Sequence, residues 1–312
     1  MAHERRFRFG IQLSSAPDGA TWGALARQAE DLGYDTLFMP DHFGDQLAPV
    51  PALMAAADAT SELKVGALVF DNDYKHPVVL AKELATMDVL SSGRVEVGLG
   101  AGWMKSDYDQ SGIAMDRPGV RVTRLEEGIA VIKGCFAPGP FSFQGEHYTI
   151  AGYDGLPKPV QSPPPFLIGG GAKRVLSIAA REAQIVGINP SIHSGTADAA
   201  AAQNGASAET DRKVGWVREA AGDRYADLEI NLLQFAAILT DDRKGTAETM
   251  APLFGLPPEE LDAYPHACIG AIEEICASIE ARRDRWDASY ITFQGTEAME
   301  AMAPVVAKLR GT

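Results

Sequence analysis

Long hydrophobic runs are absent from this sequence of 312 residues. No apolar stretch approaches the roughly 18 residues that a membrane-spanning helix requires. The N-terminal segment, "MAHERRFRFGIQL", lacks an apolar core of signal-peptide length and continues at once into a strand-like pattern. We therefore expect a protein without a membrane partner.

Cysteine and positive charge are also scarce. Only Cys135, Cys268 and Cys276 are present, and they form no CxxC pattern. An odd number of cysteines without metal-ligand spacing predicts reduced thiols, a cytoplasmic location and no metal site. The formal net charge of -14 argues against nucleic acid and against an anionic membrane as partners. An anionic ligand would therefore need a local site built from cationic side chains or backbone N–H groups.

The rest of the composition is ordinary for a globular protein, with 46% hydrophobic residues, 31 Gly and 19 Pro. A chain of this size buries about three quarters of its unfolded surface, so we expect one domain over residues 1–312. Runs typical of strands occur at 6–13, 36–39, 63–70, 94–102, 165–171, 185–190, 228–239 and 288–295. Helical patterns occur at 21–33, 51–60, 76–93, 122–136, 172–183 and 296–309.

This alternation predicts an α/β fold, a closed (β/α)8 TIM barrel with insertions after strands four, six and seven. The alternative is a doubly wound open sheet, but no GxGxxG motif opens the first helix. Segments 137–164 and 191–227 exceed ordinary loop lengths. Each predicts either a wall or lid over a substrate, or a helical or hairpin addition.

The strand ends of a barrel converge on one mouth, where active sites are built. The residues expected there are Gln12, Asp41, His42, Phe70, Asp71, Asn72, Gly100, Ala101, Gly102, Trp103, Gly169, Gly170, Gly171, Asn189, Phe293 and Gln294. The set contains few charges and several glycines. It suits a flat, uncharged ring lying against backbone better than hydrolysis by paired carboxylates.

Two glycine-rich stretches follow strands. In "IGGGAKR" (168–174), the glycines and the next helix offer backbone N–H groups, and Lys173 and Arg174 add charge, which predicts a phosphate site. The alternative is a tight turn with solvated basic residues. In "GLGAGW" (98–103), the missing side chains favour either ligand approach to the backbone or close helix packing.

Three further polar residues have simpler interpretations. His76, before a helix-starting Pro77, is typical of a structural cap or a satisfied turn. Asp107 and Asp109 are interpreted as solvated loop residues.

Together these motifs resemble the bacterial luciferase-like superfamily, and specifically its oxidoreductases that use the deazaflavin coenzyme F420. The matching pieces are "LGYDTLFMPDHF", "HPVVLAKELATMDVLSSGRVEVGLGAGW", "DY" at 107–108, "RLEEGIAVIK" and "FLIGGGAKRVLSIAAREAQIVGINP". They occur in family order over about residues 6–190, whereas residues 191–285 carry little of the resemblance.

The resemblance implies catalytic roles for His42 and Asp41 beside the reactive carbon of the coenzyme. His42 would donate a proton to the substrate or orient it, and Asp41 would bond the ring or fix the imidazole tautomer. A satisfied turn is the alternative for this pair. The resemblance also implies a non-proline cis bond at Leu68-Val69, lying against the ring, and a homodimer formed through 51–60 and 76–91. The implied cofactor-binding residues are Asp41, His42, Leu68, Val69, Gly100, Ala101, Gly102, Trp103, Gly169, Gly170, Gly171, Lys173 and Asn189.

Two departures narrow the expected reaction. Similar sugar-phosphate dehydrogenases carry a Trp and a Glu where this chain has Gln46 and Ala101. We therefore expect hydride transfer from reduced F420 to an activated C=C or C=N bond, or to a carbonyl, of a small organic substrate. An FMN-dependent monooxygenase or reductase is the alternative, because both cofactors have a phosphate and a tricyclic ring. A cofactor-binding protein without turnover is a further alternative.

Overall fold

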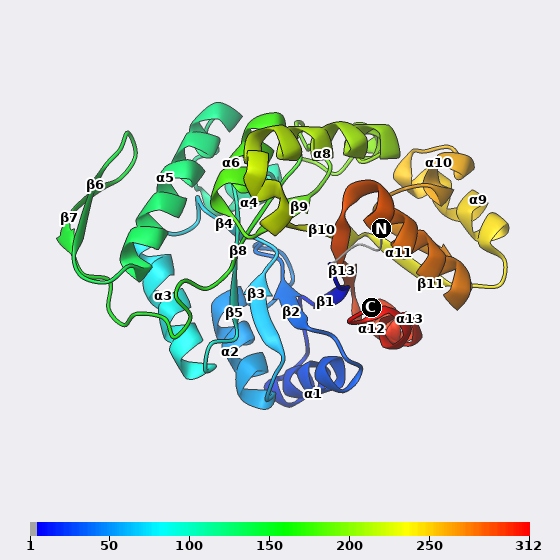
Figure 1. Cartoon of the computed structure of the whole chain (residues 1–312), viewed down its shortest axis with the longest axis horizontal. Helices are drawn as coiled ribbons and strands as arrows, with labels where there is room; N and C mark the ends of the chain where they lie inside the picture. Colours follow the sequence, from blue (N-terminus) through cyan, green and yellow to red (C-terminus); the bar gives the residue numbers. More distant parts are fainter. Residues whose placement is uncertain (1–4) are drawn as a thin grey trace.

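The computed structural model describes residues 5–312. Its centre is a closed barrel of parallel strands, in which each strand pairs with the next and the last pairs with the first (Figure 1). The barrel strands are β1 (Arg8–Gln12), β2 (Thr36–Met39), β3 (Lys64–Ala67), β5 (Val95–Gly100), β8 (Phe166–Gly170), β9 (Ile185–Ile188), β10 (Glu229–Gln234) and β13 (Ala288–Gln294). The predicted TIM barrel is confirmed, and the open-sheet alternative is wrong.

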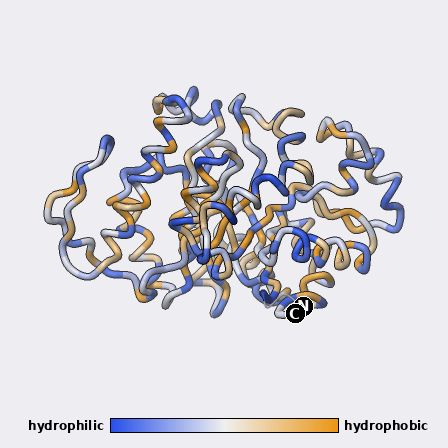
Figure 2. The backbone as a smooth tube through the Cα atoms, turned by 45° about the horizontal axis from the view of Figure 1, so that its top comes forward, coloured by the Kyte–Doolittle hydropathy of each residue, from blue (hydrophilic) through white to orange (hydrophobic). Residues whose placement is uncertain are grey.

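Helices cover the outside of the barrel (Figure 1). They are α1 (Gly19–Asp31), α2 (Pro49–Ala59), α3 (Pro77–Leu90), α5 (Pro118–Phe136), α6 (Lys173–Glu182), α8 (Ser207–Ala221), α11 (Ile272–Trp286), α12 (Thr296–Ala301) and α13 (Ala303–Leu309). The apolar strands lie at the centre of the molecule and the polar segments lie mainly outside (Figure 2). None of these helices, within the part of the chain that is described, combines the length and the apolar character needed to cross a bilayer.

Every position of β2 is buried, because its two faces serve different cores. Phe38 points into the barrel, where it packs with Leu68, Leu167, Leu233 and Tyr290. Its neighbours Leu37 and Met39 belong to the larger core between the strands and the helices.

Two predicted strands are divided in the structure. The predicted strand 63–70 becomes β3 and a short β4 (Phe70–Asp71), separated by Leu68 and Val69. The predicted strand 228–239 becomes β10 and β11 (Ala236–Leu239), and β11 leaves the barrel to pair with β12 (Ala267–Gly270). The short helices α9 (Arg243–Phe254) and α10 (Pro258–Asp262) connect these last two strands.

The two long segments contain regular structure. Residues 137–164 contain an antiparallel hairpin, β6 (Phe141–Gln144) and β7 (Thr149–Tyr153), which projects beyond α5 at the left of Figure 1. Residues 191–227 contain α7 (Ala199–Asn204), α8 and the 3-10 turn η1 (Gly222–Asp227). The predicted hairpin and helical structure is therefore present, and a role of either segment as a wall or lid over a substrate stays a prediction.

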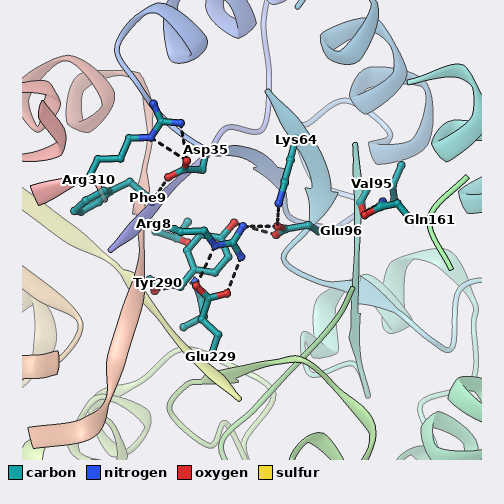
Figure 3. A network of polar contacts seen from close by, with 12 residues as sticks. Arg8, Phe9, Asp35, Lys64, Val95, Glu96, Gln161, Glu229, Tyr290 and Arg310 are labelled. Atoms are coloured by element: carbon teal, nitrogen blue, oxygen red, sulfur yellow. Dashed lines mark hydrogen bonds and ion pairs between the residues drawn. The ribbon is translucent and has the colours of Figure 1, made fainter. Parts of the chain in front are cut away.

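A buried ionic network occupies the end of the barrel where the strands begin (Figure 3). The Arg8 guanidinium lies 2.8 Å from a Glu96 carboxylate oxygen and 2.7 Å from a Glu229 oxygen, and it covers the Tyr290 ring at 4.1 Å. Burial alone would raise the pKa of Glu96, but the charges of Arg8 and Lys64 hold it below its ordinary value. We define Arg8, Lys64, Glu96, Glu229 and Tyr290 as the barrel floor, because they form a network around the buried Glu96 and Tyr290 at the end opposite the mouth.

Candidate active site

The third barrel strand bends into the mouth immediately after Ala67. The peptide bond between Leu68 and Val69 is cis, as the resemblance implied. The side-chain amide of Gln12, at the end of β1, donates to the Leu68 carbonyl oxygen at 2.8 Å. The backbone N–H of Leu68 donates to the Met39 carbonyl at 2.8 Å. Neighbouring strands on one side therefore hold this bend in place.

The Val69 side chain fills space left by glycines of the strands on the other side. A Cβ atom on Gly100 would lie 2.5 Å from Val69 Cγ2, and one on Gly169 would lie 3.2 Å from Val69 Cγ1. Helix packing, one of our two interpretations of "GLGAGW", is therefore wrong for Gly100, because its close neighbour is Val69, in the bend between β3 and β4. Ligand approach to this backbone stays a prediction.

His42 is held by Asp107, a contact that the sequence did not predict. The two residues meet with 2.7 Å between Nδ1 of His42 and Oδ2 of Asp107. The Asp107 side chain is only 5% exposed and also accepts from the Tyr74 hydroxyl at 3.0 Å and the Phe43 N–H at 3.3 Å. Our interpretation of Asp107 as a solvated residue is wrong. Asp107 lies in the first turn of α4 (Lys105–Ser111). This helix begins after the loop that follows β5, and it faces the loop that follows β2.

Asp109 behaves as expected, since its exposed side chain pairs with Lys105 on the same helix. His76 also behaves as expected, because it is the N-cap of α3 and its Nδ1 accepts from the Val78 N–H at 3.3 Å.

Asp41 does not hold the imidazole. Its Oδ2 accepts from the backbone N–H of Asp71 at 3.1 Å, so the tautomer role that we considered for Asp41 passes to Asp107. Burial raises the pKa of Asp41 to about 6. This carboxyl group therefore titrates near neutral pH, and a contact with a cofactor ring stays a prediction.

Asp71 and Asp73 share the hydroxyl group of Tyr108. The Tyr108 oxygen lies 2.9 Å from Oδ2 of Asp71 and 3.1 Å from Oδ2 of Asp73. A hydroxyl has one hydrogen, so both contacts are satisfied only when one carboxyl group carries a proton. Burial raises the pKa of Asp71 to about 7, whereas Asp73 is paired with Arg124 at 2.8 Å. Asp71 is therefore the group expected to carry that proton.

The loop after β5 forms one wall of the mouth. Gly102 has a φ of +73°, and a Cβ atom there would collide with the Tyr108 hydroxyl and the Asp71 carboxyl. Arg121 of α5 donates to the carbonyl oxygens of Ala101 and Gly102 at 3.3 and 2.5 Å. The Trp103 ring meets the His42 ring edge-on, with centroids 5.5 Å apart. The wall is thus fixed from α5 and restricts the imidazole.

The glycine-rich turn joins β8 to α6. The Asn189 N–H donates to the Gly170 carbonyl at 2.9 Å, which ties the ends of β8 and β9 together. The Lys173 ammonium pairs with Glu219 at 3.1 Å, and Arg174 donates to the Gly119 carbonyl at 3.0 Å. These basic groups are thus engaged by α8 and α5. No side chain caps the first turn of α6 within the described chain, so its backbone N–H groups keep the donors that a phosphate site needs.

A buried cation lies behind this turn and was not predicted. The Lys213 ammonium donates to the carbonyl oxygens of Asn189 and Asn204 at 2.9 and 2.6 Å. Burial lowers the pKa of Lys213 to about 8. Lys213 lies on α8, where the sequence pattern gave no sign that a lysine would point inward.

Three residues that we expected at the mouth point elsewhere. Phe70 and Phe293 pack in the core between strands and helices. Asn72 faces Gly128 of α5 and lies 3.4 Å from the Tyr148 hydroxyl at the root of the hairpin. Successive strand residues point to opposite faces, so only alternate residues at a strand end reach the mouth.

A cavity of about 420 Å³ lies on the outer surface beside α8, α10 and α11. Its charged lining residues are already paired, as in Arg243 with Asp262 and Arg285 with Asp211. The mouth, where Asp41, His42, Asp71 and Asp107 gather, is therefore the candidate active site.

Comparisons by sequence identify the family and several relatives of this chain. The sequence profile of luciferase-like monooxygenases matches residues 6–304. An FMNH2-dependent dimethylsulfone monooxygenase of Pseudomonas putida is 31% identical over 176 residues, which are 53% of this chain and 48% of that protein. An F420-dependent glucose-6-phosphate dehydrogenase of Amycolatopsis mediterranei is 29% identical over 154 residues, which are 47% of this chain and 46% of that protein.

The fold is similar to that of coenzyme F420-dependent tetrahydromethanopterin reductase from Methanopyrus kandleri. The TM-score is 0.80 at 18% identity, over 98% of this chain and 100% of that chain. The chain spans less than two thirds of the length of the curated relatives that it matches, and about half for the two named above.

Proposed function

The chain belongs to the luciferase-like monooxygenase family, and we propose that it is a single-domain, F420-dependent oxidoreductase of that family. Hydride would pass between the reduced coenzyme and an activated C=C or C=N bond, or a carbonyl, of a small organic substrate. The relatives named above depend on F420 or on FMNH2, which supports a deazaflavin or flavin cofactor, and the choice of F420 is our proposal.

The observation that carries the proposal is the fixed imidazole at the mouth. His42 is held through Nδ1 and its side chain is 24% exposed, so Nε2 is the ring nitrogen left for a substrate. Addition of hydride to one atom of a double bond requires a proton at the other atom. In the reducing direction the Nε2–H bond of His42 breaks, its electron pair stays on nitrogen, and the proton passes to the substrate. In the reverse direction Nε2 accepts that proton.

The mouth offers features that suit such a coenzyme. The ring would lie against Val69 and the β5 loop, near Asp41, where glycines leave the backbone open on the mouth side. Its phosphate would lie at Gly169–Gly171 and the uncapped first turn of α6, with Asn189 and Lys173 alongside. When bound, the coenzyme would supply two-electron hydride chemistry. The protein's part is to position the ring, exclude water and exchange the proton at His42.

Titration of the apo-protein with F420 and with FMN tests the choice of cofactor. We favour F420 because the β5 loop, Gly100 to Met104, offers no Asn or His side chain to a flavin. We expect F420 to bind and FMN to bind weakly or not at all. Tight FMN binding without F420 binding would replace the proposal by the FMN-dependent alternative.

Turnover separates an enzyme from a protein that only binds its cofactor. The contact between His42 and Asp107 supports chemistry rather than storage, because a simple binding site does not need a held proton donor. A panel of enones, imines and small ketones with the reduced coenzyme is the direct test. If the reduced coenzyme binds but no compound of the panel oxidises it, the alternative of a cofactor-binding protein without turnover is favoured.

We also propose a homodimer formed through α2 and α3. α3 carries apolar side chains on its outer face as well as its inner face, and Val79, Val89 and Leu90 are exposed. An exposed apolar helix face is typical of an interaction surface. Sedimentation at micromolar concentration should show a dimer, and a Leu90→Lys variant should shift it towards monomer. A monomeric unsubstituted protein would contradict this proposal.

The cytoplasmic location is likewise a proposal, supported by three free, buried cysteines.

A further inference from the structure

We propose that Asp107 is a positioning residue that sets the proton chemistry of His42. In this inference, which rests on the proposed function, the Asp107 carboxylate keeps the hydrogen of the neutral imidazole on Nδ1. It thereby makes Nε2 the nitrogen that exchanges a proton with the substrate.

Among the residues that the structure describes, each hydrogen-bond contact of the Asp107 carboxylate is with a donor or with the imidazole. The Tyr74 hydroxyl donates to Oδ2 at 3.0 Å and the Phe43 N–H donates to Oδ1 at 3.3 Å. An ionised carboxylate only accepts hydrogen bonds. The 2.7 Å contact between Oδ2 and Nδ1 of His42 therefore requires a hydrogen on Nδ1. After Nε2 has given up its proton, the neutral ring is left in that tautomer.

The position of Asp107 is itself fixed from several sides. The next residue on α4, Tyr108, bonds to Asp71 at 2.9 Å and to Asp73 at 3.1 Å. The N–H of Lys105, the first residue of α4, donates to the Gly195 carbonyl at 3.0 Å. The carboxylate is thus supported by contacts that do not involve His42. It can orient the imidazole instead of following it.

The imidazole has little freedom to turn away from Asp107. The edge-on Trp103 ring restricts it on one side, and the backbone N–H of the adjacent Phe43 bonds to the same carboxylate. The other acid next to it, Asp41, is engaged by the Asp71 N–H at 3.1 Å. Asp107 is therefore the group that decides which ring nitrogen faces the substrate.

The test compares Asp107→Asn with Asp109→Asn, the same chemical change two residues later on α4. The Asp109 side chain is 56% exposed and pairs with Lys105 on its own helix. We expect Asp107→Asn to lower kcat by about 10²-fold or more, because an amide no longer specifies the tautomer and general acid–base catalysis is lost. The coenzyme Kd should stay within a few-fold, and Asp109→Asn should keep the original kcat.

A double-mutant cycle distinguishes positioning from a general structural role. If Asp107 acts only through His42, Asp107→Asn should cause no further loss of kcat in a His42→Ala background. Losses that multiply fully would show that Asp107 supports the fold or another group, and would overturn the inference.

Nitrogen-15 NMR of the histidine rings supplies a readout that needs no turnover. The His42 signals are assigned by their loss in His42→Ala, and we expect Nδ1 protonation in the neutral ring of the unsubstituted protein. The opposite tautomer would overturn the inference even if Asp107→Asn failed to fold. An active unsubstituted enzyme with a fully active Asp107→Asn variant would overturn this inference alone. Absence of turnover with either reduced cofactor would instead overturn the proposed function, and the inference with it.

Discussion

The Tyr108 hydroxyl lies 2.9 Å from Oδ2 of Asp71, a carboxyl group that is almost completely removed from water. The same hydroxyl oxygen lies 3.1 Å from Asp73. Three oxygen atoms therefore meet at the edge of the mouth, and the protonation of Asp71 decides whether their contacts attract or repel.

The first prediction concerns the pH dependence of stability. The pKa of Asp71 is raised by burial from 3.8 to about 7, so the folded state binds the proton more tightly than the unfolded state. Its stabilising contribution is complete below about pH 4 and is lost as the pH rises through about 7. Between pH 5 and 8, this group should cost the unsubstituted protein about 2–3 kcal/mol of unfolding free energy.

Denaturant unfolding of Asp71→Asn and of the unsubstituted protein at several pH values isolates the contribution of Asp71 to the unfolding free energy. The variant should lose less stability between pH 5 and 8, and Asp109→Asn should follow the unsubstituted curve. Parallel curves for Asp71→Asn and the unsubstituted protein would show that Asp71 titrates in its ordinary range.

The second prediction concerns His42. His42→Ala should lower kcat by about 10²–10⁴-fold, the usual size of general acid–base assistance. The coenzyme Kd should change by no more than a few-fold, because the imidazole acts on the substrate. Steady-state kinetics and a binding titration measure the two quantities. If His42→Ala keeps full activity, the stretch "PDHF" is a satisfied turn and His42 has no catalytic role.

His76→Ala is a matched control for His42→Ala. His76 caps α3 through Nδ1, and loss of a helix cap typically costs about 0.5–2 kcal/mol of stability. We expect this variant to lower the melting temperature while kcat stays unchanged.

The third prediction concerns the approach of a phosphate or ring to the β8 turn. Gly170 is a poor probe, because a Cβ atom there would lie 2.5 Å from Val175 Cγ1 and disturb the packing of α6. Gly169 faces Val69 and Asn189 instead, with nearest contacts of 3.2 and 3.6 Å. Gly169→Ala should therefore weaken coenzyme binding by about tenfold, or 1.4 kcal/mol, with kcat at saturation retained.

A fluorescence titration of the coenzyme checks this expectation. Gly19→Ala is the control, since a Cβ atom at Gly19 meets nothing within 4 Å. Unchanged affinity in Gly169→Ala would place the coenzyme away from this turn.

The fourth prediction concerns the barrel floor. Glu96→Gln leaves the largely buried Arg8 charge without its closest buried partner, and breaking such a pair typically costs about 3–5 kcal/mol. Glu229→Gln should cost less, because the Glu229 side chain is partly exposed. Urea denaturation measures both variants. A larger effect for Glu229→Gln would show that burial of Glu96 does not control the network.

The barrel itself was predictable because parallel strands buried on both faces give continuous apolar runs separated by helical periodicity. The exit of β11 was not. Residues 228–239 form one largely apolar run, and where the chain leaves the barrel the Phe235 N–H donates to the His266 carbonyl at 2.8 Å. A contact with a residue so distant in the sequence leaves no trace in the local pattern.

The candidate site was predictable where it follows strand ends and was missed where it depends on tertiary contacts. Asp41 and His42 lie at the mouth as expected, but Asp107 reaches His42 across 65 positions in the chain.

For Glu96, in the barrel floor, a usable signal existed. It lies between Val95 and Val97 in a buried strand, which is the alternation expected of a side chain that points into the barrel.

The barrel floor also has a kinetic consequence. Arg8, Glu96 and Tyr290 meet at the end of the barrel opposite the mouth (Figure 3), so ligands at the strand ends would arrive from the mouth side. A coenzyme ring lying deepest, against Val69, would be covered by any substrate that reaches His42. The two reactants would then have a compulsory order, with coenzyme arriving first and departing last. Product-inhibition patterns should be those of an ordered sequential enzyme, and random-order patterns would mean that the ring leaves a second path open.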